Sequence, residues 1–176
     1  PGGLFCFAPA GPLTRDELDL VTEHFNPQCL PGLLPNKEVK VGDTWPVGDA
    51  AAAAACLFDA VIKTNLTGKL TAEKDGGATF AIEGTAAGLE SGAKVGVTVS
   101  ATGTFDAAVG GITALTWKQT DDREQGPVNP ASKVEATVTL KREGLAEPPK
   151  ELADAALAAV PVAGEVPPRL GDLRYA

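Results

Sequence analysis

The stretch KVGVTVSATGTFD, residues 94–106, decides the fold class of this chain. Its odd positions from Val95 to Phe105 carry valine, alanine, glycine and phenylalanine, whereas lysine, serine, threonine and aspartate fill nearly all the even ones. A period of two residues is typical of a β-strand with one buried face and one solvated face. The stretch therefore predicts one long strand.

Four further runs of the same kind extend this pattern over residues 61–142, and glycine-rich turns such as 75–77 and 110–111 separate them. Consecutive strands joined by short turns pair antiparallel. We predict a meander of about five strands of roughly 10 to 14 residues each, against an ordinary strand length of about 5 or 6. In the first run we assign to the dry face Ile62, Thr64, Leu66, Gly68, Leu70 and Ala72, and to the wet face Lys63, Asn65, Thr67, Lys69, Thr71 and Glu73.

Three segments outside the meander have helical character, and they cover residues 15–25, 50–58 and 150–160. A capping box of Thr14 and Glu17 begins the first, and Asp49 is expected to cap the second, which is rich in alanine. The predicted fold class is therefore α+β, mainly β. It is a long-stranded antiparallel meander, a curved sheet or half-barrel, with two or three helices over its apolar face.

A chain of 176 residues fits one domain. We assign residues 13–160 to a single α+β domain, with the meander at about 61–142, residues 1–12 to an extended N-terminal arm, and residues 161–176 to a Pro/Gly-rich C-terminal tail. The chain contains no methionine, so we expect Pro1 to follow a processing or excision point rather than a translation start.

The charge of the chain argues against two classes of partner. The formal net charge is −8, and the 15 lysines and arginines are scattered, whereas nucleic acids and anionic membrane surfaces are bound by clustered basic residues. No apolar run approaches the roughly 20 residues of a membrane-spanning helix. We therefore expect no nucleic-acid partner and no transmembrane segment, and instead a protein partner of unknown identity or an apolar small molecule.

The cysteines allow two interpretations. Cys6, Cys29 and Cys56 have no CxxC spacing, and His24 is the one histidine of the chain, so we predict no zinc site and no other metal site. The cysteines are either buried or free thiols, or Cys29 and Cys56 form a disulfide that joins two helical segments in an oxidising compartment.

The densest acidic cluster is Asp121-Asp122-Arg123-Glu124. Two carboxylates can bind Ca²⁺ or act as an acid and base pair, but neighbouring strand residues point to opposite faces, so we interpret the cluster as a solvated strand end. The glycines form neither GxGxxG nor a P-loop. We therefore assign no catalytic, cofactor-binding or metal-binding residue and no cofactor, and we expect a protein that is not an enzyme.

The segment Val39-Lys40-Val41-Gly42-Asp43-Thr44-Trp45 is the most distinctive string of the chain. Gly42 and Asp43 are expected to form a turn, and the indole of Trp45 is expected to cap the apolar layer. With the preceding Leu34-Pro35, it resembles an LPxxxVxVGDxW segment of uncharacterised bacterial envelope and secreted β-rich proteins. The resemblance implies an exported, non-enzymatic module in the periplasm, at the cell surface or outside the cell.

Two functions fit these features. The first is a non-catalytic structural or surface-interaction module of the cell envelope, supported by the threonine-rich wet face. The second is a carrier of an apolar ligand or lipid between sheet and helices. Small residues on the dry face, such as Gly68, Ala78 and Gly103, leave room either for such a ligand or for closely packed helices.

Overall fold

The computed structural model describes residues 14, 27–127, 129–144, 147 and 150. The chain divides into two units. One consists of Arg15–Glu143, and the other consists of Pro1–Thr14 together with Gly144–Ala176. All the elements below belong to the first unit. The predicted arm and tail, and the predicted helices at 15–25 and 150–160, lie outside the described residues apart from Lys150.

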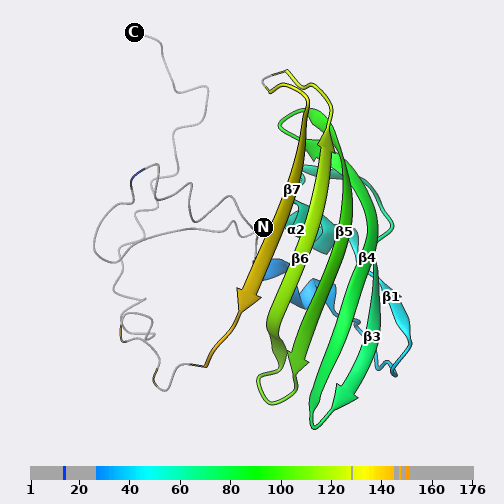
Figure 1. The fold of residues 1–176 in the computed structure, drawn as a ribbon, viewed down its shortest axis with the longest axis vertical. Helices are drawn as coiled ribbons and strands as arrows, with labels where there is room; N and C mark the ends of the chain where they lie inside the picture. Colours follow the sequence, from blue (N-terminus) through cyan, green and yellow to red (C-terminus); the bar gives the residue numbers. More distant parts are fainter. Residues whose placement is uncertain (1–13, 15–26, 128, 145–146, 148–149, 151–176) are drawn as a thin grey trace, which may run out of the picture. The chain divides into compact units, whose positions relative to one another are not determined.

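The prediction of an antiparallel sheet is confirmed. The unit contains a seven-stranded, unclosed sheet in the order β1-β3-β4-β5-β6-β7, with β2 paired to β4 (Figure 1). β4 to β7 are 14, 14, 13 and 10 residues long, as expected from their unbroken alternation. The elements in chain order are η1 (Pro27–Leu33), β1 (Thr44–Pro46), α2 (Asp49–Cys56), β2 (Ala60–Thr64), β3 (Thr67–Lys74), β4 (Gly77–Glu90), β5 (Ala93–Asp106), β6 (Gly111–Arg123) and β7 (Ser132–Lys141).

The first predicted strand is interrupted, and this corrects both the expectation of one continuous strand and the expected position of Ile62. β2 and β3 are separate strands that both pair with β4, and the register shifts between Val61 and Lys63. Ile62 lies at this β-bulge and is 56% exposed, whereas we expected it on the dry face. A bulge adds one unpaired residue to a strand and locally disrupts the alternation on which the assignment depended.

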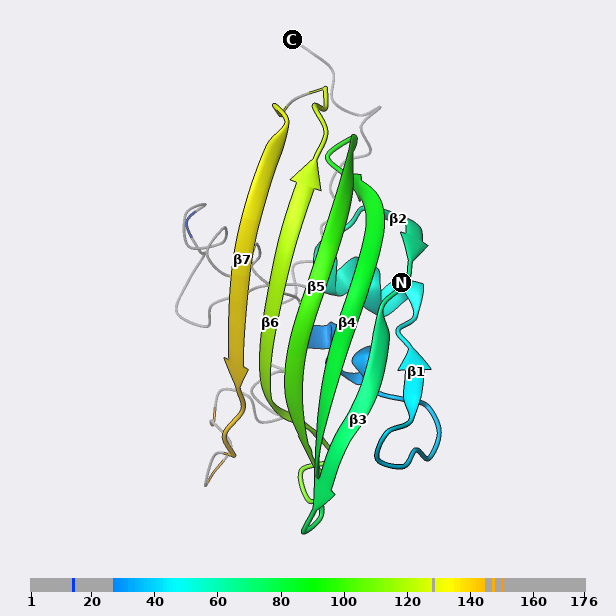
Figure 2. The same ribbon diagram turned by 45° about the vertical axis from the view of Figure 1, so that its right-hand side comes forward.

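One face of the sheet is covered by η1 and α2, as Figures 1 and 2 show. The core lies between these layers, and its most deeply buried large side chains include Trp117, Phe80, Leu33 and Ile82. Among the described residues α2 is the one α-helix, so the two or three predicted helices are not confirmed.

Helix α2 lies close to η1 because both elements present small residues. A Cβ added to Gly32 would lie 2.8 Å from the Cβ of Ala51. The helix begins at Asp49, with Gly48 as its N-cap, so Asp49 belongs to the first turn and is not the cap that we predicted. Leu57, with φ of 58°, ends it in the left-handed conformation.

Aromatic rings fill the space above two glycines of the covered face. A Cβ added to Gly68 would overlap the indole of Trp45, and one added to Gly103 would overlap the ring of Phe80. Each ring lies against the backbone of a neighbouring strand, because Trp45 pairs with Gly68 and Phe80 pairs with Gly103. At these positions the small residues leave room for rings rather than for a ligand or a helix.

Candidate functional site

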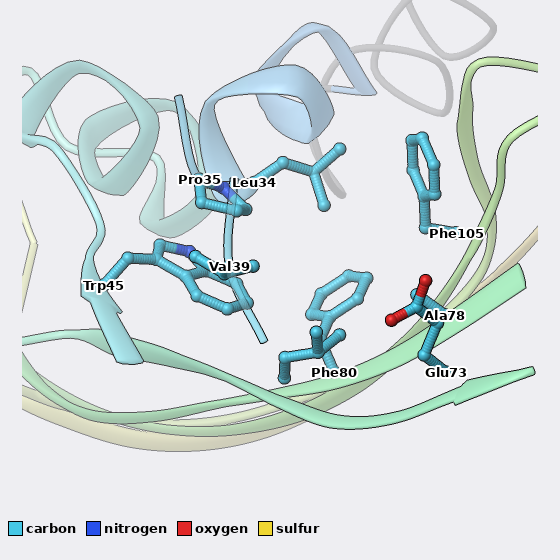
Figure 3. Close-up of a pocket in the computed structure, with 9 residues that line it drawn as sticks. Leu34, Pro35, Val39, Trp45, Glu73, Ala78, Phe80 and Phe105 are labelled. Carbon is cyan, nitrogen blue, oxygen red and sulfur yellow. The ribbon is translucent and has the colours of Figure 1, made fainter. Parts of the chain in front are cut away.

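An apolar cavity of about 230 Å³ lies between the sheet and the segment that joins η1 to β1 (Figure 3). All but one of its lining residues are apolar, and three of them are aromatic. The lining consists of Leu34, Pro35, Val39, Trp45, Leu70, Glu73, Ala78, Phe80 and Phe105.

Trp45 forms one wall of this cavity and is only 4% exposed. Its indole Nε1 donates a hydrogen bond to the backbone oxygen of Leu33 at 2.9 Å, so the buried N–H is satisfied. The ring centroid lies 6.4 Å from that of Phe80, and the two ring planes are inclined by 54°. The indole is therefore held by η1 at one edge and by the sheet below.

The motif before Trp45 attaches this wall to the edge of β3. The N–H of Gly42 donates to the carbonyl of Leu70 at 2.8 Å, and the N–H of Leu70 donates to the carbonyl of Asp43 at 3.1 Å. Gly42 has φ of +97°, a conformation that favours glycine. The Asp43 carboxylate accepts the N–H of Lys40 at 2.9 Å, which closes the turn. Gly42 and Asp43 thus position the wall of the cavity.

Glu73 reaches the cavity because β3 contains a second β-bulge. The register shifts between Leu70, which pairs with Phe80, and Ala72, which pairs with Thr79. Glu73 then pairs with Ala78 on the covered face. We had assigned Glu73 to the wet face and Ala72 to the dry one; the register exchanges the two faces, although Glu73 is exposed as expected. Bulges often re-aim a side chain in this way.

Phe105 completes the aromatic lining at the far end of β5. It pairs with Ala78 on one side and with Ile112 on the other, next to a register shift between Thr104 and Phe105. Glu73, Ala78 and Phe105 therefore lie side by side on β3, β4 and β5.

A second hollow, of about 520 Å³, lies between the end of α2 and strands β6 and β7. Trp117 Nε1 donates to Gln119 Oε1 at 2.8 Å, and Asp121 lies two residues further along the same face. Burial raises the pKa of the Asp121 carboxyl above its ordinary value, while a hydrogen bond from Gln119 opposes the rise. The Oδ1 atom of Asp121 is buried and has no hydrogen-bond partner among the described residues. Asp121 is thus not the solvated residue that we expected, although Asp122 is exposed.

Cys29 and Cys56 are both buried, and no disulfide joins them in this structure. The pKa of each thiol is raised to about 12, mainly by burial, and for Cys56 the nearby Asp121 carboxylate and Cys29 contribute to the rise. A thiol with so high a pKa is a poor nucleophile at neutral pH, because the thiolate is the reactive form. The Cys29–Cys56 disulfide stays a prediction. Cys6 and His24 lie outside the described residues.

The remaining candidate residues form no reactive cluster in the described part of the chain. Thr14 is exposed, and Glu17, its predicted capping partner, lies outside that part. No group of three or more His, Cys, Asp or Glu side chains that could hold a metal ion occurs among the described residues. Nor does any helix found there have the length and hydropathy to cross a membrane.

Comparisons with models of known protein families, with curated proteins and with solved structures find no match. The site is therefore defined by its own geometry: an unclosed antiparallel sheet, a small aromatic-lined cavity on its covered face, and one carboxylate at that cavity.

The sequence contained a signal for Glu73 that regular alternation obscures. The turn at Asp75-Gly76 sets Lys74 opposite Gly77, and continuing that register without a bulge would place Leu70 opposite a residue of the wet face. A meander with Leu70 and Phe80 on one dry face therefore needs one extra residue between them. We found no comparable signal for the partial burial of Asp121.

Proposed function

We propose that this chain is an exported, non-catalytic carrier that holds a small apolar group in the cavity beside Trp45. The observation that supports the proposal is the aromatic-lined cavity of about 230 Å³ between the sheet and its cover. Apolar lining with few polar groups is typical of small-molecule sites. The proposal retains the expected half-barrel with further helices over its apolar face, although the residues expected to form them lie outside the described part.

The size of the cavity limits the ligand. An engineered apolar cavity of about 150 Å³ binds benzene, whereas sites for drug-sized molecules are about 300 to 1,000 Å³. A cavity of about 230 Å³ therefore suits one ring or a short branched alkyl group, not a whole lipid. Of the carrier functions that the sequence suggested, we retain the one with a small ligand.

The proposal contains no catalytic step. Glu73 is the one titratable side chain of the cavity lining. General acid–base or nucleophilic catalysis requires several groups that converge on the reacting atoms. The lining supports binding rather than turnover, and it calls for no cofactor.

Filling the cavity tests the carrier function. Ala78→Leu adds apolar volume to the lining, and Ala81→Leu is the matched control on the opposite face of β4. We expect the native protein and Ala81→Leu to bind fluorobenzene saturably, followed by ¹⁹F NMR, and Ala78→Leu to lose this binding. Equal binding by both variants would place the ligand elsewhere and contradict the proposal.

The opposite face favours a second candidate, the surface-interaction module. Threonines lie in cross-strand rows there, for example Thr102, Thr116 and Thr139 on β5, β6 and β7. Such rows present hydroxyl donors and acceptors in a regular array, suited to a hydroxyl-rich polymer of the envelope. Thr102→Val with Thr116→Val should then abolish co-sedimentation with isolated cell-wall polysaccharide while leaving fluorobenzene binding unchanged. Undiminished co-sedimentation would remove the threonine rows from that role.

A further inference from the structure

The cavity combines aromatic rings with a single acidic side chain. Figure 3 shows the rings of Trp45, Phe80 and Phe105 around the hollow, and the Glu73 carboxylate pointing from the sheet into it. The rings come from β1, β4 and β5, and the carboxylate comes from β3. Four strands thus contribute side chains to one site.

Among the residues that the structure describes, no basic side chain pairs with the Glu73 carboxylate. None of the lining residues is basic. The adjacent Lys74 has its Nζ 3.8 Å from Asp75, and in the described part of the chain Glu73 takes part in no ion pair. Glu73 is exposed at the cavity, and a neutral ligand there would gain no electrostatic attraction from its carboxylate. An anionic ligand would be repelled.

Aromatic faces favour the same kind of ligand as the carboxylate. The face of an aromatic ring carries partial negative charge and attracts cations, most strongly when they are desolvated. A compact ammonium ion is strongly hydrated, whereas a cation covered by methyl or ring carbons sheds water at lower cost and packs against apolar walls. The cavity therefore matches an ion that is both cationic and apolar at its surface.

We propose that the ligand of this cavity carries a quaternary or alkyl ammonium group, held against Trp45, Phe80 and Phe105 with Glu73 as its counter-ion. This inference rests on the proposed carrier function and assigns its ligand class. The bulge in β3 is the element that makes it possible, because it sets Glu73 beside Ala78 on the covered face.

A pair of probes of nearly identical shape separates charge from apolar burial. Phenyltrimethylammonium and tert-butylbenzene differ in whether nitrogen or carbon carries the three methyl groups, and the methyl singlet of each reports binding in ¹H NMR titrations. We expect the native protein to bind the cation about tenfold more tightly than the hydrocarbon, the magnitude of a partly desolvated cation–π and ion-pair contribution.

Two charge variants assign the preference to one residue. Glu73→Gln should reduce the preference for the cation to the part that the aromatic rings contribute, because it removes the counter-ion and retains the shape. Glu83→Gln removes the same charge from a residue of β4 that is exposed like Glu73 but lies on the opposite face, and it should keep the native preference.

The outcomes distinguish this inference from the carrier function. Equal or tighter binding of tert-butylbenzene by the native protein would overturn the cationic ligand and leave the carrier function standing. Binding of neither probe, together with no binding of fluorobenzene, would overturn both. A cation preference that Glu73→Gln leaves undiminished would overturn the role of this carboxylate.

Discussion

Individual residues on the covered face have roles that follow from their backbone neighbours. Trp45 lies on Gly68 and donates its N–H to Leu33, so its ring position is determined by packing below and by a hydrogen bond at its edge. Asp121 is a contrasting case, since its carboxyl is partly buried and one oxygen finds no partner in the described part of the chain. The first residue stabilises the layer, and the second weakens it.

Trp45→Ala should lower the free energy of unfolding by about 3 to 5 kcal/mol, because it empties a large buried site. It also leaves the Leu33 carbonyl without its donor. Trp45→Phe retains most of the buried ring and should destabilise the protein less than Trp45→Ala. The loss of the N–H hydrogen bond should contribute about 1 to 2 kcal/mol, in addition to the loss from the smaller ring. Urea unfolding measures both. A loss below about 1 kcal/mol for the alanine variant would contradict the structural role.

From the burial of Asp121 we predict a specific dependence of stability on pH. Its pKa in the folded protein lies above the ordinary 3.8, so the folded state binds the proton more tightly than the unfolded state. The contribution of this carboxyl is therefore most favourable below pH 3.8 and is lost as pH rises through the folded-state pKa. Asp121→Asn should raise the midpoint of urea unfolding at pH 7 and gain less near pH 4.

The control for this change is Asp122→Asn, which removes the same charge from the exposed neighbour on the opposite face. We expect no comparable gain from it. If both variants gain equally at pH 7, the effect comes from net charge rather than from burial of Asp121.

At the scale of elements, the β3–β4 hairpin shows how much of the site the sequence could predict. Alternation correctly places Leu70 and Phe80 on the covered face, where both are buried. It misplaces Glu73, because a pattern of period two contains no information about where an extra residue is absorbed. The aromatic half of the site was thus predictable, whereas the carboxylate required the register.

The bulge in β3 leads us to predict that one residue can be deleted there at low cost. Thr71 is the residue left out of the β3–β4 pairing, so deleting it should leave every other cross-strand partner unchanged. The main loss is its hydroxyl hydrogen bonds to Thr79, which gives an expected cost of about 1 kcal/mol.

Deleting Ser100 from β5 is the matched control. β5 is regularly paired with β4 along its whole length, so this deletion moves the side chains on one side of it to the opposite face of the sheet. It should cost more than about 3 kcal/mol, since several valines leave the core. Thermal unfolding of the two deletion variants compares them, and equal losses would show that Thr71 is not a spare residue.

At the scale of the whole molecule, the division into a covered and a hydroxyl-rich face was predictable for the unit Arg15–Glu143. β5 follows the predicted alternation from Ala93 to Gly103, buried at every odd position and exposed at every even one. The sequence did not predict that the motif strand β1 joins the sheet, because three residues are too few to show a period. It also missed the hollow at Asp121, since burial there depends on α2, which is distant in the chain.

The glycine floor beneath the rings has a consequence for how this protein can change. Any side chain at Gly68 or Gly103 would overlap the ring above it, and both rings line the cavity, so such a substitution would displace a cavity wall. Substitution of Gly68 or Gly103 can therefore only reduce the volume of the cavity and select smaller ligands. Larger ligands require substitutions in the segment between η1 and β1 or in the aromatic rings. New specificities in this scaffold should therefore first be sought at Leu34, Val39 and Phe105.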